Sequence, residues 1–192
     1  GNGTVDEKDG ISMLEVYVKT TPGYSAREYA SNAQPWSGLF ISYIMSGGDS
    51  QFPKSLAHIN YIKDAMDGKN GYEAFALKGG LKIKAEVGDL FCKARTGGSH
   101  CDVVYKIDGN KAKLVGGNVS DSVKEIVLTT DSGYVTDATD VKGYQLVVKK
   151  TGNKYYKGKK MSSLSTPGKT AGCPAMSKNK PLKKASGFQT YI

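Results

Sequence analysis

The sequence has no long hydrophobic run and few cysteines. No stretch of 18 apolar residues occurs among its 192 residues, so we expect no membrane-spanning helix. Three cysteines are too few for a fold held together mainly by disulfides. Cys92 and Cys101 could pair across a hairpin, which would leave Cys173 alone. Neither a C-x-x-C motif nor a Cys/His spacing typical of zinc is present, and no metal site is expected.

Acidic residues are missing from the C-terminal part of the chain. Residues 149–192 contain 11 of the 27 basic residues, all lysines, and none of the 18 acidic ones. Residues 1–148 therefore carry a net charge of −2, although the whole chain carries +9. Such a tail suits a polyanion, which could be a cell-wall polymer, a nucleic acid or an anionic membrane surface. The alternative is a solvated tail without a partner.

The change of composition divides the chain into three parts. We expect a disordered lead-in at residues 1–10, one folded domain at 11–149 and a Lys-rich basic extension at 150–192. The sequence begins at Gly1 rather than Met, which leaves open that an export leader precedes it. A short helix is possible at "SAREYA", residues 25–30.

Two helices are predicted in the N-terminal half of the domain. Residues 35–46 are apolar nearly all round, which indicates a buried helix with Pro35 in its first turn and Gly47-Gly48 at its end. Residues 54–67 show an apolar stripe with His58 on its flank. The runs after residue 70 are short, β-rich and not interrupted by helices. This order predicts an α+β fold with an antiparallel sheet.

The segment "HCDVVYKIDGNKAKLVGGNV" predicts a hairpin. With a three-residue loop at 108–110, Ile107 would pair with Lys111, and His100 would then lie opposite Asn118. An amide there could fix the tautomer of the imidazole and leave its other nitrogen free as a base. The alternative is a structural His–Asn hydrogen bond at the end of the hairpin.

Three segments in order carry a resemblance to a known superfamily. They are "PWSGLF" at the start of the first helix, "GDLFCKARTGGSHCDVV", and "LVGGNVSDSV". Together they resemble the CHAP and NlpC-type cell-wall amidases and endopeptidases, which are papain-like enzymes. They are also similar to an uncharacterised bacterial and phage family of that superfamily, which has Ser in place of the catalytic Cys. The resemblance covers roughly residues 34–130 and implies a papain-like domain, with a buried N-terminal helix on the sheet.

The resemblance implies a catalytic group of Ser37, His100 and Asn118. Ser37 takes the position of the nucleophilic cysteine, His100 that of the general base, and Asn118 that of the residue that orients the base. A hydroxyl, unlike a thiol, needs a base that removes its proton as it attacks. Ser37 could therefore be a working nucleophile, a relic in a binding protein, or an ordinary serine at a helix start.

Three further residues are candidates for the binding site. Trp36 could line a substrate groove or belong to the core. His58 lies in "SLAH", which is similar to an S-A-x-H motif of the related family, and could line the cleft or be a capped or exposed residue. Asp102 shares a strand face with His100 and could orient it, or be solvated.

The expected function is hydrolysis of an amide bond in peptidoglycan-like material, by a monomer that needs no cofactor. The expected location is the cell envelope or the secreted fraction, in a bacterial or phage setting. The rival is a non-catalytic module that keeps the fold and holds a cell-wall polymer or another polyanion through its lysines. A nucleic-acid partner is a third interpretation, which only the tail supports.

Overall fold

The computed structural model describes residues 11–21, 25, 35–77, 82–136 and 139–151. The predicted lead-in at 1–10, nearly all of the predicted "SAREYA" helix and the extension beyond residue 151 lie outside the described residues.

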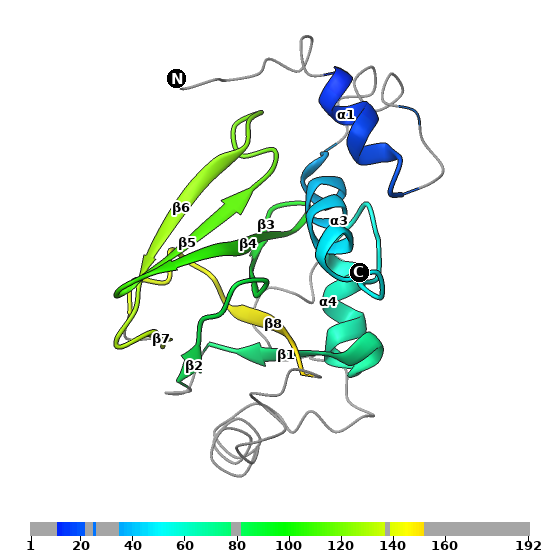
Figure 1. Cartoon of the computed structure of the whole chain (residues 1–192). Coiled ribbons are helices and arrows are strands. Elements are labelled where there is room, and N and C mark those ends of the chain that lie inside the picture. The colour runs from blue at the N-terminus through cyan, green and yellow to red at the C-terminus, as the bar shows by residue number, and fades with distance from the viewer. Residues whose placement is uncertain (1–10, 22–24, 26–34, 78–81, 137–138, 152–192) are drawn as a thin grey trace.

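The described chain is an α+β domain, as predicted. Its helices are α1 (Ile11–Val18), α3 (Ser37–Gly48), α4 (His58–Met66) and the 3-10 turn η1 (Lys69–Gly71). Its strands are β1 (Tyr72–Ala76), β2 (Ile83–Lys84), β3 (Leu90–Arg95), β4 (Gly98–Asp108), β5 (Lys111–Gly116), β6 (Lys124–Thr129), β7 (Tyr134–Val135) and β8 (Leu146–Lys150). The six-stranded sheet has the order β1-β8-β3-β4-β5-β6, and β2 pairs with β7 (Figure 1). Every strand pair is antiparallel.

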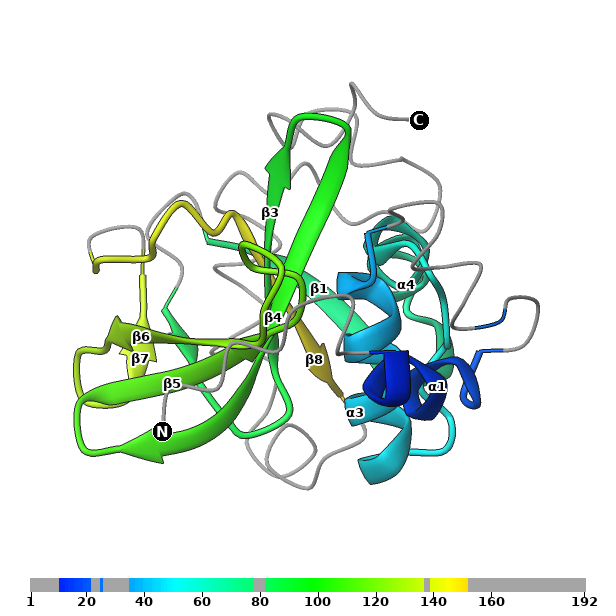
Figure 2. The same cartoon turned by 90° about the horizontal axis from the view of Figure 1, so that it is seen from above.

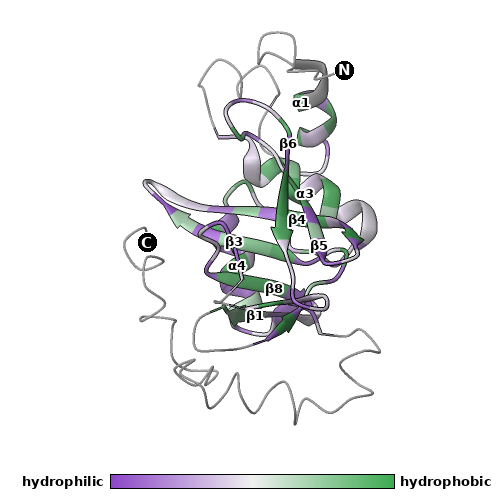
Figure 3. Ribbon diagram, turned by 90° about the vertical axis from the view of Figure 1, so that its left-hand side faces the viewer, coloured by the Kyte–Doolittle hydropathy of each residue, from purple (hydrophilic) through white to green (hydrophobic). Residues whose placement is uncertain are grey.

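The helices cover one face of the sheet, and each face has its own apolar core. α3 and α4 lie beside β4, β8 and β1 (Figure 1), and hydrophobic residues follow β8 and the middle of β3 and β4 (Figure 3). The core under the helices joins Leu39, Ile41 and Ile62 to inward-facing residues of β3 and β4. The core on the opposite face includes Phe91 and Leu114. The strand alternation therefore gives the sheet two buried faces.

The first predicted helix begins and ends later than its turn residues indicated. α3 starts at Ser37, two residues after Pro35, because the Trp36 carbonyl accepts the first bond, from the Phe40 N–H at 3.0 Å. The two glycines stay helical, and the helix ends only where Asp49 N–H bonds to Met45 O at 2.8 Å. The prediction that this helix is buried is confirmed for most of its residues.

The second helix is shorter than predicted, because its expected first turn serves as a connector. Ser42 Oγ donates to Ser55 O at 2.7 Å and accepts from Ser55 N–H at 2.9 Å, which docks the connector on α3. A Cβ atom at Gly38 would collide with the Leu56 carbonyl, so only glycine permits this approach. α4 consequently begins at His58, next to the start of α3.

The β4–β5 hairpin has a shorter turn than predicted. Asp108 pairs with Lys111 and Ile107 with Ala112, so the loop is two residues long. A bulge at Tyr105 then shifts the register by one residue. Val104 pairs with Leu114 beyond the bulge, which is the predicted register. The bulge therefore compensates for the shorter turn, and the pairing returns to the predicted register before the strand reaches His100.

A disulfide joins the two strands that the sequence suggested. Cys92 and Cys101 are directly opposed on β3 and β4, and both are fully buried. Their bond lies beside the Lys93–His100 pair of the ladder, so it holds together the hairpin that carries His100. No helix within the described ranges is long and apolar enough to cross a membrane.

Candidate active site

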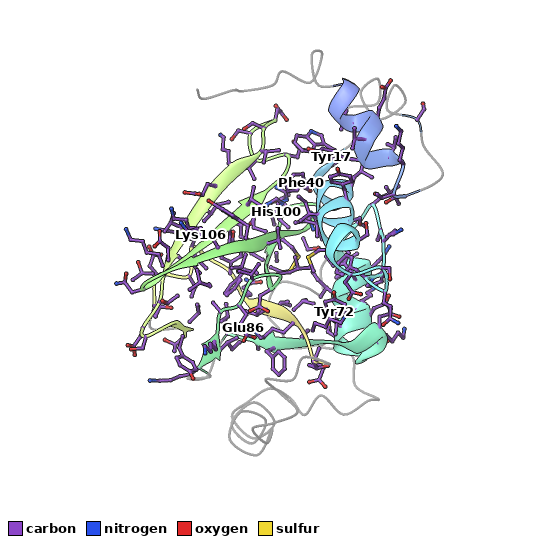
Figure 4. All side chains as sticks on the ribbon, viewed as in Figure 1. Tyr17, Phe40, Tyr72, Glu86, His100 and Lys106 are labelled. Carbon is purple, nitrogen blue, oxygen red and sulfur yellow. A yellow bond between two sulfur atoms is a disulfide. The ribbon has the colours of Figure 1, made fainter. Side chains whose placement is uncertain are left out.

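Three distant parts of the chain meet where α3 begins: the start of α3, the middle of β4 and the loop after β5. A Cβ atom at Gly117 would lie 2.6 Å from Phe40 Cβ, and one at Gly116 would collide with Asp102. The two glycines therefore let the loop pack against both elements at once. Figure 4 shows His100 between β4 and α3, below Phe40. The three segments that carry the superfamily resemblance are thus neighbours in space.

Ser37 is the first residue of α3, and its hydroxyl is buried. Its side chain is 2% exposed, and its Oγ lies 2.7 Å from His58 Nε2. Arg95 Nη2 also donates to this Oγ, over a longer distance of 3.4 Å. The first turn of a helix has unpaired N–H groups and the positive end of the helix dipole. Ser37 therefore has a histidine at its hydroxyl and an environment that stabilises negative charge.

His58 connects Ser37 to Tyr61. Its ring is buried, with Nε2 on Ser37 and Nδ1 on the hydroxyl of Tyr61, one turn further along α4. If Nδ1 carries the proton and donates to Tyr61, then Nε2 is free to accept the proton of Ser37. Burial lowers the pKa of His58 well below 6.5, and the nearby His100 and Arg95 lower it further. The imidazole is therefore neutral at pH 7, as a base must be.

A second hydrogen-bonded group contains His100, Asp102 and Tyr144. His100 Nε2 lies 3.0 Å from Asp102 Oδ1, and the Tyr144 hydroxyl donates to Asp102 Oδ2. Both His100 and Asp102 are almost fully buried. His100 Nδ1 is also buried and has no hydrogen-bond partner in the described part of the chain. Burial, together with Asp102, raises the pKa of Tyr144, so its hydroxyl stays protonated as a donor.

The two groups are in contact through their histidines. The rings of His58 and His100 meet edge to face, with centroids 5.3 Å apart. Asp102 is also close enough to raise the pKa of Tyr61, after the larger effect of burial. The carboxylate of Asp102 thus acts on a member of each group: it is hydrogen-bonded to His100 and raises the pKa of Tyr61.

The predicted contacts of Ser37 with His100 and of His100 with Asn118 are not observed, whereas the contact of His100 with Asp102 is present. The hydrogen bond of Ser37 goes to His58 rather than to His100, because α4 begins beside α3. Asp102, not Asn118, holds His100, because residues two apart on a strand share a face.

Asn118 lies beyond the end of β5 rather than opposite His100. Its φ of 56° is left-handed and turns the chain away from the ladder. Its side-chain amide, with oxygen and nitrogen placed to satisfy both contacts, accepts from the backbone N–H of Trp36 at 3.2 Å and donates to Asp121 Oδ1 at 3.1 Å. Asn118 therefore holds the residue before Ser37.

Trp36 is a core residue next to the site. Its side chain is 7% exposed and stacks on Tyr17 with ring centroids 6.3 Å apart. The indole Nε1 is buried without a hydrogen-bond partner among the residues described. The ring thus packs directly against Gly117 in the loop after β5.

Sequence reasoning missed three residues of this site: Tyr61, Arg95 and Tyr144. Tyr61 follows His58 by three residues, so a helix that begins at His58 would have predicted their contact. Arg95 and Tyr144 reach the site from distant parts of the chain, 58 residues from Ser37 and 42 residues from Asp102. No local pattern predicts either contact.

The arrangement can support nucleophilic acyl transfer. It has a hydroxyl, a neutral base on that hydroxyl and a helix start that can hold an oxyanion. Within the described ranges, no three His, Cys, Asp or Glu side chains are grouped so that they could hold a metal ion.

Comparison with known proteins gives one family. Residues 17–149, which run from the end of α1 into β8 and include the whole site, match a family described as uncharacterised and conserved in bacteria, DUF2272. No curated protein and no solved structure matches the chain. Since the match covers more than half of the sequence, the chain belongs to the DUF2272 family.

Proposed function

We propose that this protein hydrolyses amide bonds in peptidoglycan-like material, with Ser37 as the nucleophile. The observation that carries the proposal is the 2.7 Å contact between Ser37 Oγ and His58 Nε2 at the start of a buried helix. A serine hydroxyl is a weak nucleophile unless a base takes its proton, and here a neutral base is already in place.

The reaction would proceed through an acyl-enzyme. His58 Nε2 takes the proton of Ser37 as Oγ attacks the carbonyl carbon, and N–H groups of the first turn of α3 hold the oxyanion. The same nitrogen then gives the proton to the leaving amine as the C–N bond breaks. Water, deprotonated by His58, attacks the acyl-serine, and the proton returns to Ser37 Oγ as the acid leaves.

The identity of the base has a second candidate. The resemblance to papain-like enzymes assigns the base to His100, and its buried Nδ1 has no partner among the described side chains. The distance to Ser37 favours His58, whereas the adjacent carboxylate favours His100. Separate His58→Ala and His100→Ala variants decide between them, because loss of the base removes nearly all activity.

The substrate class and the location rest on the sequence and the disulfide. The three segments that resemble cell-wall amidases are neighbours around Ser37, which supports a cell-wall substrate. A disulfide between Cys92 and Cys101 is typical of oxidising compartments. We therefore propose that the protein works as a monomer at the cell envelope or after secretion, where its Lys-rich tail meets anionic polymers.

A variant series tests the nucleophile on purified cell-wall sacculi. Ser37→Ala should abolish release of new amino groups, whereas Ser46→Ala, on the same helix but bonded to Tyr43 O, should not change it. Ser37→Cys should react with iodoacetamide faster than a free thiol, because a helix start and the neighbouring Arg95 cation lower a thiol pKa. Hydrolysis that survives Ser37→Ala would exclude this nucleophile.

The rival function is a non-catalytic wall-binding module. One observation favours it: Ser37, His58 and His100 are only 2–4% exposed. A substrate could therefore reach Ser37 only if the residues that cover it moved. A Ser37→Cys protein that binds sacculi, hydrolyses nothing and reacts no faster than a free thiol would favour this alternative over the hydrolase.

A further inference from the structure

Arg95 brings a positive charge to the site that no acidic group neutralises in the described chain. It is the last residue of β3 and pairs with Gly98 across a two-residue turn. The side chain is exposed, yet its guanidinium reaches the buried Ser37 Oγ at 3.4 Å. No carboxylate lies within ion-pair distance of Arg95 among the described residues. The hairpin that carries it projects beyond β5 and β6 (Figure 2).

The surroundings of Arg95 add positive rather than negative charge. Lys93 precedes it by two residues on the same face of β3, and its Nζ lies 4.7 Å from the ring centre of Tyr144. The carboxylate of this region, Asp102, is buried and already bonded to His100 and Tyr144. An anion that approaches Ser37 from the hairpin side therefore meets Arg95 and Lys93 without an opposing acid among the contacts described.

We propose that Arg95 binds a carboxylate of the substrate, within a few bonds of the amide that Ser37 attacks. This inference rests on the proposed function and specifies its substrate class as an acidic peptide. The planar guanidinium matches a carboxylate with two parallel hydrogen bonds. Its present bond to Ser37 is long for a hydrogen bond, so a carboxylate would replace it with shorter, charge-assisted ones. When Arg95 binds the substrate carboxylate, it would no longer contact Ser37 Oγ, which would then be hydrogen-bonded to His58 only.

Binding measured without turnover tests the inference independently of catalysis. The probes are a peptidoglycan stem peptide with free carboxylates and the same peptide with every carboxylate amidated. In a Ser37→Ala background, titration calorimetry should show the free acid binding about tenfold or more tightly, the worth of a charged hydrogen-bond pair. Adding Arg95→Gln should remove this preference, and Arg95→Lys should restore part of it. Lys106→Gln, which removes an exposed charge on the same sheet, is the matched control and should keep the preference.

The outcomes separate this inference from the proposed function. Equal binding of the two probes, an undiminished preference in Arg95→Gln, or no binding of either probe overturns the role of Arg95. If the parent chain hydrolyses sacculi and binds the two probes equally, the proposed function is supported but the role of Arg95 in carboxylate binding is not. A preference that depends on Arg95 in a chain that hydrolyses nothing supports carboxylate binding by Arg95 and contradicts the hydrolase.

Discussion

At the scale of single residues, His58, the proposed base, has no carboxylate of its own among the described residues. His58 is held by a neutral tyrosine, and the acid of the site is bonded to the other histidine. A buried histidine in such a position loses affinity for protons. The imidazole of His58 is therefore unprotonated at neutral pH, and its ring meets the edge or face of His100, which holds the carboxylate of Asp102.

This electrostatic state predicts the acidic limit of activity. Burial lowers the pKa of His58 well below 6.5, with further contributions from His100 and Arg95. The base acts in its unprotonated form, so kcat/KM on sacculi should stay high down to pH 6.5 and fall only as the pH drops through the lowered pKa. Arg95→Gln should move this limit upward, because a nearby positive charge is lost. A limit at or above pH 6.5 in the parent would show that His58 is not the base.

A second residue-scale prediction concerns the buried lysine of β8. Lys149 is 1% exposed, contacts Asp89, lies 3.2 Å from Glu86 and donates to Lys84 O at 2.7 Å. Burial raises the pKa of Asp89 to about 6 despite this partner, so at pH 7.5 its carboxylate is mostly ionised. Lys149→Met should then lower the free energy of unfolding by about 3–5 kcal/mol, the cost of an uncompensated buried charge.

The stability loss caused by Lys149→Met should depend on pH, and the raised pKa of Asp89 fixes the direction of that dependence. Losing Lys149 raises the pKa of Asp89 further, so the variant gains stability relative to the parent as pH falls and Asp89 takes up a proton. Urea unfolding should therefore show a smaller loss at pH 5 than at pH 7.5. Lys150→Met, whose lysine is 41% exposed and bonded to Asp49, is the matched control and should lose less at pH 7.5. A loss independent of pH would contradict the raised pKa of Asp89.

At the scale of elements, the hydrophobic periodicity predicted correctly that the segments of α3 and α4 form helices and that the chain after residue 70 forms strands. The turn residues Gly and Pro predicted the wrong boundaries for these elements. The apolar surface of α3 and the alternation of the strands follow from local patterns, and both appear in the structure. The glycines at the end of α3 permit a stop without requiring one, and the bulge at Tyr105 has no local signal. Contacts between elements, such as Arg95 with Ser37, depend on packing and could not be read from either segment alone.

The hairpin of β3 and β4 is the element that carries both His100 and Arg95, and its disulfide can be tested. The Cys92–Cys101 bond closes a short loop, with a sequence separation of 9. In the loop-entropy account, such a bond stabilises the fold by about 2–3 kcal/mol. Cys92→Ala combined with Cys101→Ala should lower the unfolding free energy in urea by about this amount. Cys173→Ala should not, and a reductant should reproduce the effect in the parent and in Cys173→Ala but not in the double variant.

The same double variant reports on the site. If the disulfide positions the hairpin, the variant should lose activity on sacculi at temperatures where it is still folded, and it should bind acidic peptide less tightly. Unchanged stability under both oxidising and reducing conditions would show that the strand ladder alone holds the hairpin.

At the scale of the whole molecule, the charge of the sequence is unevenly distributed: residues 1–148 carry a net charge of −2, and the lysine-rich part follows them. The family match ends at residue 149, inside β8, and Thr151 still bonds to Gly71 O through its N–H and its hydroxyl. The domain thus uses Lys149 and Lys150 for its own ion pairs. The nine lysines of residues 152–192 have no acidic residue among them in sequence. The excess positive charge of the chain is therefore concentrated in residues 152–192.

This division predicts that the extension adds affinity for anionic polymers and leaves the chemistry of the domain unchanged. Residues 1–151 should keep the folding of the full chain and its kcat on small acidic peptides, while binding to sacculi that retain their anionic polymers weakens. The difference should shrink as salt rises, since charges are screened beyond about 8 Å near 0.15 M. A full-length chain with the nine lysines changed to glutamine should match the truncated one, which separates charge from length.

A larger loss of binding to DNA than to sacculi on removal of the extension would indicate a nucleic-acid partner. Equal binding of full-length and truncated chains to both polymers would leave the extension as a solvated segment.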